Sequence, residues 1–342
     1  MDQDVQRAMR HRIDIAPETT HSGAPRINRE QLVVSVVAGQ IAHPVGRASA
    51  YRIGHDGVPR VLPGTGGITL NWRIGDPCIG LAGDHVEPGC ALHNNAREVV
   101  GPRNGPNLAF ITYACIGNRA TVGAGPAAGS TGWVTGKHGG VDHVLVDFPP
   151  EVLQRLKPGD PVRIVAVGLG LQLLDHPAIT ALNCSPVLLA RWGLRSSAGR
   201  LRVPVTHRLP AQLMGSGLGK NTAARGDYDI QLSDPHVMRR HRLDALRFGD
   251  LVCIDSADAR HGPGWHGGRR TIGVIVHSDS TVSGHGPGVC VLLTGPASEL
   301  VPVFDARANL AAVLGVREPK PPVRRRRLVE AGARNICTPI VP

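Results

Sequence analysis

The sequence predicts a mainly β fold, a β-rich α+β chain made of several compact β-units with a few short helices. Two features of the composition support this prediction. The 342 residues include 43 glycines and 28 prolines, and only 3% are aromatic. Glycine and proline are poor in helix interiors and frequent in turns, and the segments between the turns are dominated by Val, Ile and Leu, which fill buried strands. The length is sufficient for about two domains with a substantial core.

Three segments share one local pattern, in which a Gly-Asp turn precedes an apolar run. They are RIGDPCIGL from Arg73, LKPGDPVRIVAVG from Leu156 and LRFGDLVCI from Leu246. Glycine accepts the strained turn position and aspartate caps the turn, so each segment is expected to start a strand. Because the intervals between the segments are irregular, the pattern indicates several β-units and not a true repeat.

We divide the chain into five parts. They are a polar N-terminal arm (1–30), a β-rich domain (31–150), a small β-barrel-like unit with short helices (151–205), a β-rich domain that carries a His/Asp/Gly loop (206–315) and a basic C-terminal extension (316–342). Short helices are expected at 150–156 and 185–192, each with a proline near its start, and at 305–314.

The net charge of +11 raises the question of nucleic-acid binding. The arginines are scattered except for the run Arg324 to Arg327, and few aromatic side chains are available to stack on bases. We therefore expect no nucleic-acid partner. The polar arm and the arginine run are instead expected to make contacts between the subunits of a homo-oligomer.

The seven cysteines include no Cys-x-x-Cys pair, and several lie in apolar runs, where a thiol behaves as a small hydrophobic group. The N-terminus lacks the apolar run of a signal peptide, and no stretch reaches the roughly 18 apolar residues of a membrane helix. These features predict a cytoplasmic, reduced protein that does not enter a membrane.

The glycine-rich stretch LMGSGLGKNT is not a phosphate loop. Met214 stands where the Walker pattern requires glycine, and Asn221 stands where it requires Ser or Thr. No Rossmann fingerprint follows a strand either, so we expect no nucleotide cofactor. Lys220, Asp227, Tyr228 and Asp229 are still candidates to line a substrate pocket.

The leading candidate for chemistry is GVIVHSDSTVSGHGPGV, at 273–289. A buried strand there gives way to polar residues and then to a loop with alternating glycines, which lets the backbone approach a ligand. If the strand continues through His277 and Asp279, both side chains leave on one face and His285 folds back across them. Candidate substrate contacts in this stretch are Ser278, Gly286 and Gly288. The alternative is a tight hairpin whose histidines cap backbone groups.

Two other polar stretches add candidates. GDHVEPGCALHN, at 83–94, places His85 and Glu87 in a tight turn, as metal ligands, as an acid–base pair or simply as a hydrogen-bonded turn. GKHGGVDHVLVD, at 136–147, places Lys137 and His138 before a double glycine. There the lysine would bind an anion and the histidine would act as an acid or base.

Five stretches taken together point to a known family. They are GKHGGVDHVLVDFP at Gly136, LMGSGLG at Leu213, DYDIQ at Asp227, LRFGD at Leu246 and IGVIVHSDSTVSGHGPGV at Ile272. In these stretches the chain resembles a bacterial and archaeal family catalogued as domain of unknown function 4438, and the resemblance runs from Ile41 to Leu314. It implies a β-rich chain built of several small barrel-like and sandwich-like pieces, and it brings no reaction with it.

The residue chemistry favours a metabolic enzyme, a hydrolase or lyase acting on a small polar molecule. Its catalytic groups would be His277, Asp279, His285, Lys137 and His138. A divalent metal ion (Zn²⁺, Mn²⁺ or Mg²⁺) would be held by His277, His285, His85 and Glu87. In the alternative, the chain is a non-catalytic metabolite-binding or self-assembling scaffold protein. An enzyme needs these separate motifs to meet in one pocket, whereas a scaffold leaves them dispersed.

Overall fold

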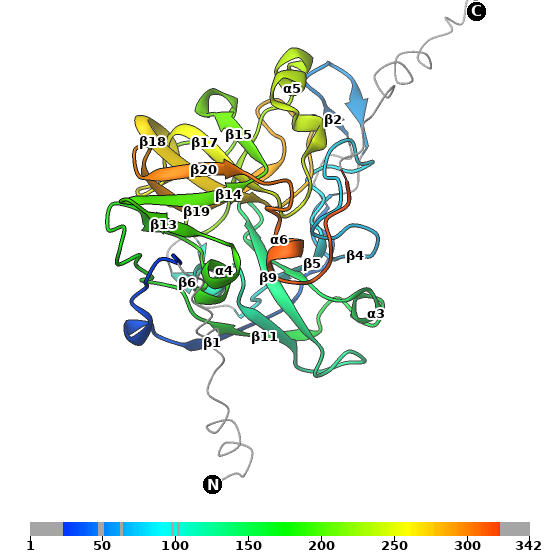
Figure 1. Cartoon of the computed structure of the whole chain (residues 1–342). Helices are drawn as coiled ribbons and strands as arrows, with labels where there is room; N and C mark the ends of the chain where they lie inside the picture. The colour runs from blue at the N-terminus through cyan, green and yellow to red at the C-terminus, as the bar shows by residue number, and fades with distance from the viewer. Residues whose placement is uncertain (1–22, 47–50, 62–63, 97–98, 101–102, 322–342) are drawn as a thin grey trace, which may run out of the picture.

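The computed structural model describes residues 23–46, 51–61, 64–96, 99–100 and 103–321. The described chain is mainly β with a few short helices, so the predicted fold class is confirmed. Two large sheets dominate it (Figure 1). Strands of the first half of the chain form the lower sheet in this view, and strands of the second half form the upper one.

The first sheet closes into a six-stranded barrel. Its hydrogen-bonded order is β1, β11, β8, β9, β10 and β5, and β5 pairs back with β1 where His93 faces Gln40. The strands are β1 (Ser35–Ile41), β5 (Gly89–His93), β8 (Arg119–Val122), β9 (Thr131–His138), β10 (His143–Asp147) and β11 (Pro161–Ala166), with β4 (Ile68–Thr69) beside β5. The segment that we assign to a separate unit at 151–205 thus contributes β11 to this barrel, next to β1 and β8.

The second sheet has six strands in the described chain, in the order β12, β19, β18, β17 and β15, with β16 also beside β19. They are β12 (Thr180–Ala181), β15 (His207–Pro210), β16 (Tyr228–Asp229), β17 (Leu251–Asp258), β18 (Gly264–Ile275) and β19 (Gly288–Pro296). A smaller sheet contains β13 (Arg195–Ser197), β14 (Arg200–Val205) and β20 (Leu300–Phe304). Two short hairpins pair β2 (Arg52–Ile53) with β3 (Pro59–Arg60) and β6 (Val99–Val100) with β7 (Arg103–Asn104).

Two helices form where the sequence predicts them. They are α3 (Pro150–Leu153) and α4 (Pro186–Arg191), and the side chain of Ser185 caps α4 by accepting a hydrogen bond from the Leu188 backbone N–H. The helix expected at 305–314 is shorter, α6 (Leu310–Val313), because the Asn309 side chain caps it four residues before Val313. The sequence did not predict α2 (Gly105–Tyr113) or α5 (Pro235–His241). Three short 3-10 turns complete the elements: η1 (Arg29–Gln31), η2 (Ala211–Leu213) and η3 (Leu243–Ala245).

The Gly-Asp turns behave alike, although not all of them start a strand. In each turn the aspartate accepts a hydrogen bond from the backbone N–H three residues earlier, at 2.8 Å for Asp76, 2.8 Å for Asp160 and 3.0 Å for Asp250. Strands β11 and β17 follow the second and third turns directly. After Asp76 the chain makes only a single bridge, between Pro77 and Arg247, so the expected strand there is wrong.

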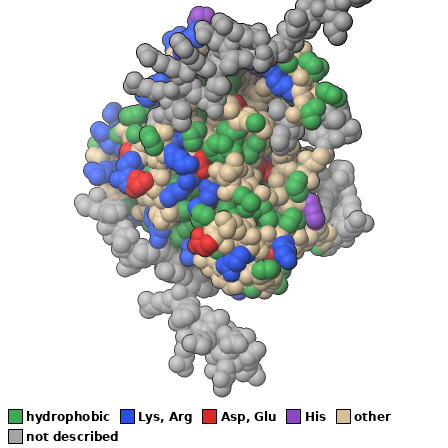
Figure 2. Space-filling view, turned by 90° about the vertical axis from the view of Figure 1, so that its right-hand side faces the viewer, with side chains coloured by type: hydrophobic (Ala, Val, Ile, Leu, Met, Phe, Trp, Pro, Cys, Tyr) green, Lys and Arg blue, Asp and Glu red, His purple; other side chains and the backbone are tan. Residues whose placement is uncertain are grey.

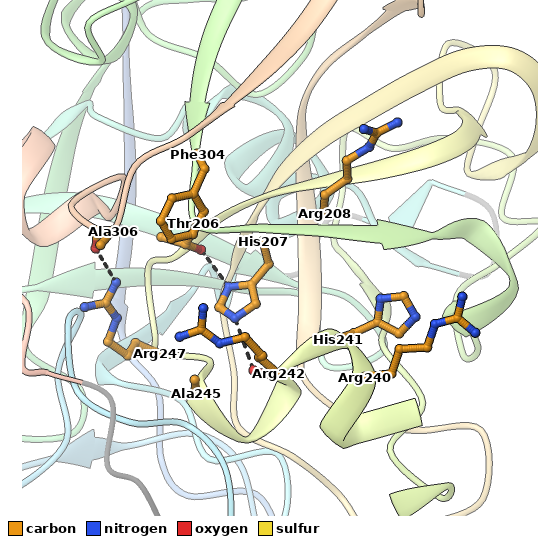
Figure 3. Close-up of a pocket in the computed structure, with 10 residues that line it drawn as sticks. All are labelled: Thr206, His207, Arg208, Arg240, His241, Arg242, Ala245, Arg247, Phe304 and Ala306. Carbon is orange, nitrogen blue, oxygen red and sulfur yellow. Dashed lines mark hydrogen bonds between the residues drawn. The ribbon is translucent and has the colours of Figure 1, made fainter. Parts of the chain in front are cut away.

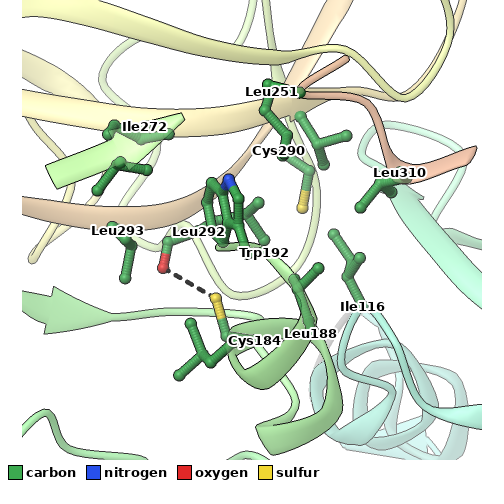
Figure 4. Close-up of a cluster of buried hydrophobic side chains, with 14 of the residues drawn as sticks. Ile116, Cys184, Leu188, Trp192, Leu251, Ile272, Cys290, Leu292, Leu293 and Leu310 are labelled. Carbon is green, nitrogen blue, oxygen red and sulfur yellow. Dashed lines mark hydrogen bonds between the residues drawn. The ribbon is translucent and has the colours of Figure 1, made fainter. Parts of the chain in front are cut away.

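An apolar cluster joins the barrel to the second sheet (Figure 4). Ile116 follows α2 in the barrel half, whereas Ile272 and Leu292 belong to the second sheet, and α4 adds Leu188. The thiol of Cys184 donates to the carbonyl of Leu292 at 3.2 Å. All six cysteines within the described residues are buried and free, as expected for thiols that act as apolar side chains.

Lys and Arg side chains are scattered among other groups on the face shown in Figure 2. The segments for which we expect subunit contacts, residues 1–22 of the arm and the run Arg324 to Arg327, lie outside the described residues. Within the part of the chain that is described, no helix is long and apolar enough to cross a membrane.

A positively charged pocket of about 270 Å³ lies beside η3 and the end of β20 (Figure 3). Four arginines and two histidines line it, with the exposed ring of Phe304. Two of the arginines already have partners, since Arg208 pairs with Asp255 and Arg247 pairs with Asp250. None of the residues singled out in the sequence as candidates for chemistry lines this pocket.

Candidate metal centre

The candidate centre lies where the barrel meets the second sheet. His138 ends β9 of the barrel, and His277 follows the end of β18. Gly136 allows this close approach, because a Cβ atom there would lie only 2.5 Å from Cγ1 of Val276. As a result, the rings of His138 and His277 lie with their centroids 4.3 Å apart.

A first group of possible metal ligands consists of His138, Asp227 and His277. All three are buried. Nε2 of His277 lies 2.7 Å from Oδ2 of Asp227. The two atoms are nevertheless not aligned for a hydrogen bond, and neither has a hydrogen-bond partner among the described residues. A cation bound between them would satisfy both atoms.

The other ring nitrogens of these histidines are held from outside the group. Nδ1 of His138 lies 2.6 Å from Oε1 of Glu87, and Nδ1 of His277 lies 2.8 Å from the carbonyl oxygen of Ser278. Metal-binding histidines commonly donate their second N–H to a carboxylate or carbonyl in this way, which fixes the tautomer and the ring orientation. Nε2 is therefore the nitrogen of each ring that is left for a cation, which on His277 would replace a proton.

Glu87 is itself fixed by further contacts. Nδ1 of His143 lies 3.1 Å from both of its carboxylate oxygens, and the backbone N–H of Gly66 donates to Oε2 at 2.7 Å. Burial would raise the pKa of Glu87, but His138 and His143 outweigh this effect and lower it. Glu87 is therefore a charged, rigid support behind His138.

A second group adjoins the first and consists of His85, Asp229 and His285. Nε2 of His85 lies 3.0 Å from Nδ1 of His285, which lies 3.2 Å from Oδ2 of Asp229. Nδ1 of His85 is held by Oδ1 of Asp84 at 3.1 Å. The side chain of His285 is 31% exposed, whereas those of His85 and Asp229 are buried. The group therefore opens to solvent at His285.

Asp84 links the second group to the hairpin of β2 and β3. Its carboxylate accepts a hydrogen bond from Oγ of Ser280 at 2.6 Å and forms an ion pair with Arg52 on β2. Burial would raise the pKa of Asp84, but His85, Ser280 and Arg52 lower it to about 2. A charged carboxylate thus holds His85 in place.

Burial and neighbouring charges compete at the centre. Burial would lower the pKa of His277, but Asp227 and Asp229 outweigh it and hold that pKa well above the usual value. Burial would raise the pKa of Asp227, but His277 lowers it. At His138, burial and the charge of His277 lower the pKa in spite of Glu87. Two charged aspartates and a neutral His138 are forms that bind a cation, whereas His277 would release its proton when a cation binds.

Gly288 on β19 leaves room for the first group. A Cβ atom at this position would lie 1.8 Å from Oδ2 of Asp227 and 2.3 Å from Nε2 of His277. Gly288 is not among the glycines with positive φ, so space and not backbone conformation is the reason for glycine here.

Of the predicted site residues, the structure brings together His85, His138, His277, His285 and Asp229. Lys137 does not join them. Its ammonium group is buried elsewhere and donates to the carbonyls of Thr112 and Ala224 and to Oδ1 of Asn183. Neighbouring residues on a strand point to opposite faces, so Lys137 and His138 diverge.

Asp279 and Glu87 also differ from their predicted roles. Strand β18 ends at Ile275, so His277 and Asp279 do not share a strand face, and Oδ2 of Asp279 instead accepts from the backbone N–H of Gly80 at 2.6 Å. Glu87 lies behind His138 and belongs to neither ligand group.

The predicted substrate contacts have structural partners near the centre. The hydroxyl of Ser278 accepts from the Val86 N–H at 2.9 Å, and the N–H of Gly286 donates to Oδ2 of Asp229 at 3.3 Å. Nζ of Lys220 donates to the carbonyl of Asp227 at 3.1 Å. These contacts fix the loops around the two groups.

The predicted metal ligands and catalytic residues included neither Asp227 nor Asp84. Asp227 and Asp229 flank Tyr228 of β16, which pairs with Val289 of β19. Alternation along a strand places two such aspartates on one face, so the stretch DYD carried a usable signal. For Asp84, the partners Arg52 and Ser280 are remote in sequence, and no local pattern indicates them.

The fold and the centre together define a mainly β chain with buried His/Asp groups suited to a metal ion. Comparison with known proteins identifies the family. The family described as "Domain of unknown function (DUF4438)" matches through its N-terminal domain at residues 51–190 and its C-terminal domain at residues 191–314. The chain therefore belongs to this family, as its motifs had suggested.

One similar solved structure is described as "Crystal structure of TM1086". It is 43% identical to this chain, with a TM-score of 0.79, and the match covers 85% of this chain and 99% of that one. No functionally curated protein matches the chain.

Proposed function

We propose that this chain is a metal-dependent hydrolase or lyase that acts on a small polar molecule. The metal would be bound by His138, Asp227 and His277. One observation carries the proposal: Oδ2 of Asp227 and Nε2 of His277 are buried 2.7 Å apart, so they form an ion pair only when the ring carries a proton, and neither atom makes an aligned hydrogen bond within the described residues. A divalent cation would replace that proton and bind both atoms. Burying such polar atoms is costly unless a bound cation compensates for the lost hydration.

The donor set favours Zn²⁺ or Mn²⁺ over Mg²⁺. Imidazole nitrogen suits zinc and other transition metals, whereas magnesium prefers oxygen ligands and retains several waters. Two histidines and one carboxylate are also a ligand set of catalytic zinc sites, in which the fourth position is left for water or substrate.

Hydrolysis fits such a centre better than elimination. A divalent ion lowers the pKa of a bound water toward neutrality and polarises the bond to be cleaved. The water oxygen would bond to the electrophilic atom of the substrate, and the bond to the leaving group would break. The leaving group would take the electron pair of that bond and a proton from the water. A lyase would instead remove a proton from carbon as the leaving group departs, and no water would be consumed.

The solvent-facing edge of the centre carries cationic groups that can contact an anionic part of a substrate, in front of the buried carboxylates. His285 lies at the opening of the second group, since its side chain is 31% exposed. The exposed Lys220 places its ammonium group beside Asp227, and the side chain of Arg52 is 20% exposed next to Asp84. Cations near an active centre attract anionic substrates and raise the rate of encounter.

Metal analysis of the purified full chain tests the proposal. His277→Ala and Asp227→Asn should each lower the affinity for Zn²⁺ or Mn²⁺ by at least about tenfold, as the loss of a ligand or of its support commonly does. His266→Ala is the matched control, because His266 is exposed on β18 and belongs to neither ligand group. Unchanged metal binding by both site variants would refute this centre.

The reaction class can be tested separately in ¹⁸O-labelled water with a panel of small esters, amides and phosphate esters. Incorporation of one ¹⁸O atom into a product identifies a hydrolase, whereas an unsaturated product without the label identifies a lyase. A chain that binds no metal and turns over no substrate would favour the alternative, a metabolite-binding or self-assembling scaffold.

A further inference from the structure

We propose that the two ligand groups form one dinuclear metal centre, in which the carboxylate of Asp229 bridges two divalent cations. This inference rests on the proposed function, because it adds a second ion to the one bound by His138, Asp227 and His277. His85 and His285 would complete the site of the second ion.

The carboxylate of Asp229 directs one oxygen to each group. Oδ1 lies 3.6 Å from Nε2 of His277, whereas Oδ2 lies 3.2 Å from Nδ1 of His285 and 3.6 Å from Nε2 of His85. A separation of 3.6 Å is too long for a hydrogen bond. It does suit two ligands of one ion, because ligands about 2.1 Å from a tetrahedral zinc lie roughly 3.4 Å apart. Each oxygen is therefore at ligand spacing from a different group.

The second group also has its nitrogens set for a cation. Nδ1 of His85 is held by the carboxylate of Asp84 at 3.1 Å. A neutral ring that donates from Nδ1 has its lone pair on Nε2. Nε2 of His85 then accepts a hydrogen bond from Nδ1 of His285 at 3.0 Å, and a cation between the two rings would replace that proton. The two metal positions thus have the same kinds of ligand. Each has a histidine from the barrel half, which a carboxylate supports, and an aspartate and a histidine from the second half.

The two positions are close enough for one bridged pair. The ring of His85 lies with its centroid 4.8 Å from that of His277 and 5.8 Å from that of His138. In two-metal enzymes the ions lie about 3.5–4 Å apart, a distance that one carboxylate can span.

The charge of the region also favours two ions. Asp84, Glu87, Asp227 and Asp229 are all buried, with at most 5% of each residue exposed. Arg52 forms an ion pair with Asp84. Buried carboxylates need cationic partners. Because Arg52 balances Asp84, three negative charges remain on Glu87, Asp227 and Asp229, and a single divalent ion would leave one of them without a cationic partner.

A bridged pair would narrow the reaction that we propose. Two adjacent ions stabilise both the attacking and the leaving oxygen of a displacement. The substrate would then be an ester of phosphoric or carboxylic acid. Water would cleave the bond between the acyl or phosphoryl atom and the leaving oxygen: the hydroxyl would go to the acid, and the leaving oxygen would take the electron pair of the broken bond and a proton.

The experiment uses the full chain, stripped with a chelator and then titrated with Mn²⁺. Bound manganese is counted by elemental analysis, and electron paramagnetic resonance detects exchange coupling between bridged ions. The wild type should bind two ions per chain with a coupled spectrum. His285→Ala, in the partly exposed loop, should bind one uncoupled ion, and Asp229→Asn should lose the coupling while keeping the side-chain volume. His266→Ala should match the wild type.

The possible results separate the two proposals. Two ions without coupling would overturn the bridge. One ion per wild-type chain would overturn the second site and leave the proposed metal-dependent function intact, provided that His277→Ala removes that ion. No bound ion would overturn both.

Discussion

Gly288→Ala tests the centre through its packing, without removing any ligand. The added methyl group would meet Oδ2 of Asp227 at 1.8 Å and Nε2 of His277 at 2.3 Å. Carbon does not approach buried atoms more closely than about 3 Å, so at least one of the two side chains must move by about 1 Å or more. Such a displacement would take Asp227 or His277 out of the position from which both can bind one ion.

The added methyl group should lower both the stability of the fold and the affinity for metal. Overpacking of a buried site commonly costs about 1–3 kcal/mol, so the free energy of unfolding of the metal-free protein should fall by that amount. The affinity for Zn²⁺ or Mn²⁺ should fall by at least about tenfold, because metal sites tolerate small displacements of their ligands poorly.

Denaturant unfolding in the presence of a chelator measures the first effect, and calorimetric titration of the refolded protein with metal measures the second. Gly267→Ala is the matched control: Gly267 lies in the same sheet, its Cβ would meet nothing within 4 Å, and it has no positive φ. It should change stability by no more than about 0.5 kcal/mol. If Gly288→Ala bound metal as tightly as the wild type, the assignment of Asp227 and His277 to one ion would be wrong.

Two further predictions concern residues outside the centre. Lys137→Met should lower the free energy of unfolding by about 1–3 kcal/mol, because Asn183 and two carbonyls lose their hydrogen-bond donor. The metal content should stay the same. Metal loss without destabilisation would contradict the structural role of Lys137. Burial would raise the pKa of Asp258, but Arg260 and Arg269 lower it to about 2. Because the unfolded value is about 3.9, this carboxylate stabilises the fold above about pH 4 and loses its contribution as the pH falls through about 2. Asp258→Asn should therefore show a shallower loss of stability in acid unfolding between pH 4 and 2, and an unchanged slope would contradict the ion pairs.

The histidines of the centre were predictable because each stands at a local break in structure. His138 precedes a double glycine and His277 ends an apolar run, and both features are visible in the sequence. Such positions place side chains at the ends of strands, where sites are commonly built. The mainly β fold was predictable for a similar reason, since turn residues and apolar runs are local signals.

The acidic partner of His277 was not predictable in the same way. The prediction for Asp279 depended on a strand that continues through it, but the backbone leaves β18 at Ile275. The carboxylates near His277 come instead from Asp227 and Asp229, which reach it because Tyr228 pairs with Val289 on β19. Pairing between remote strands fixes which residues meet, and one sequence does not encode that pairing in any local pattern.

Lys137 was wrongly predicted to lie at the centre. Its position beside His138 suggested a shared site, although alternation along β9 separates the two side chains. Three oxygen partners explain how a buried lysine is tolerated there. The alternation rule alone was therefore sufficient to separate these two residues, and it deserves more weight than adjacency in sequence.

The division of the ligands between the two halves of the chain bears on how the centre can work. His85 and His138 lie in the N-terminal family domain, whereas Asp227, Asp229, His277 and His285 lie in the C-terminal one. Each proposed ion takes one histidine from the first domain and an aspartate with a histidine from the second, so neither domain alone holds a complete site. The ions would therefore act as links between the barrel and the second sheet, next to the apolar cluster that already joins them. Metal binding that requires both domains adds its binding free energy to the stability of the folded chain. The same contacts that position the metal would therefore also hold the two domains together.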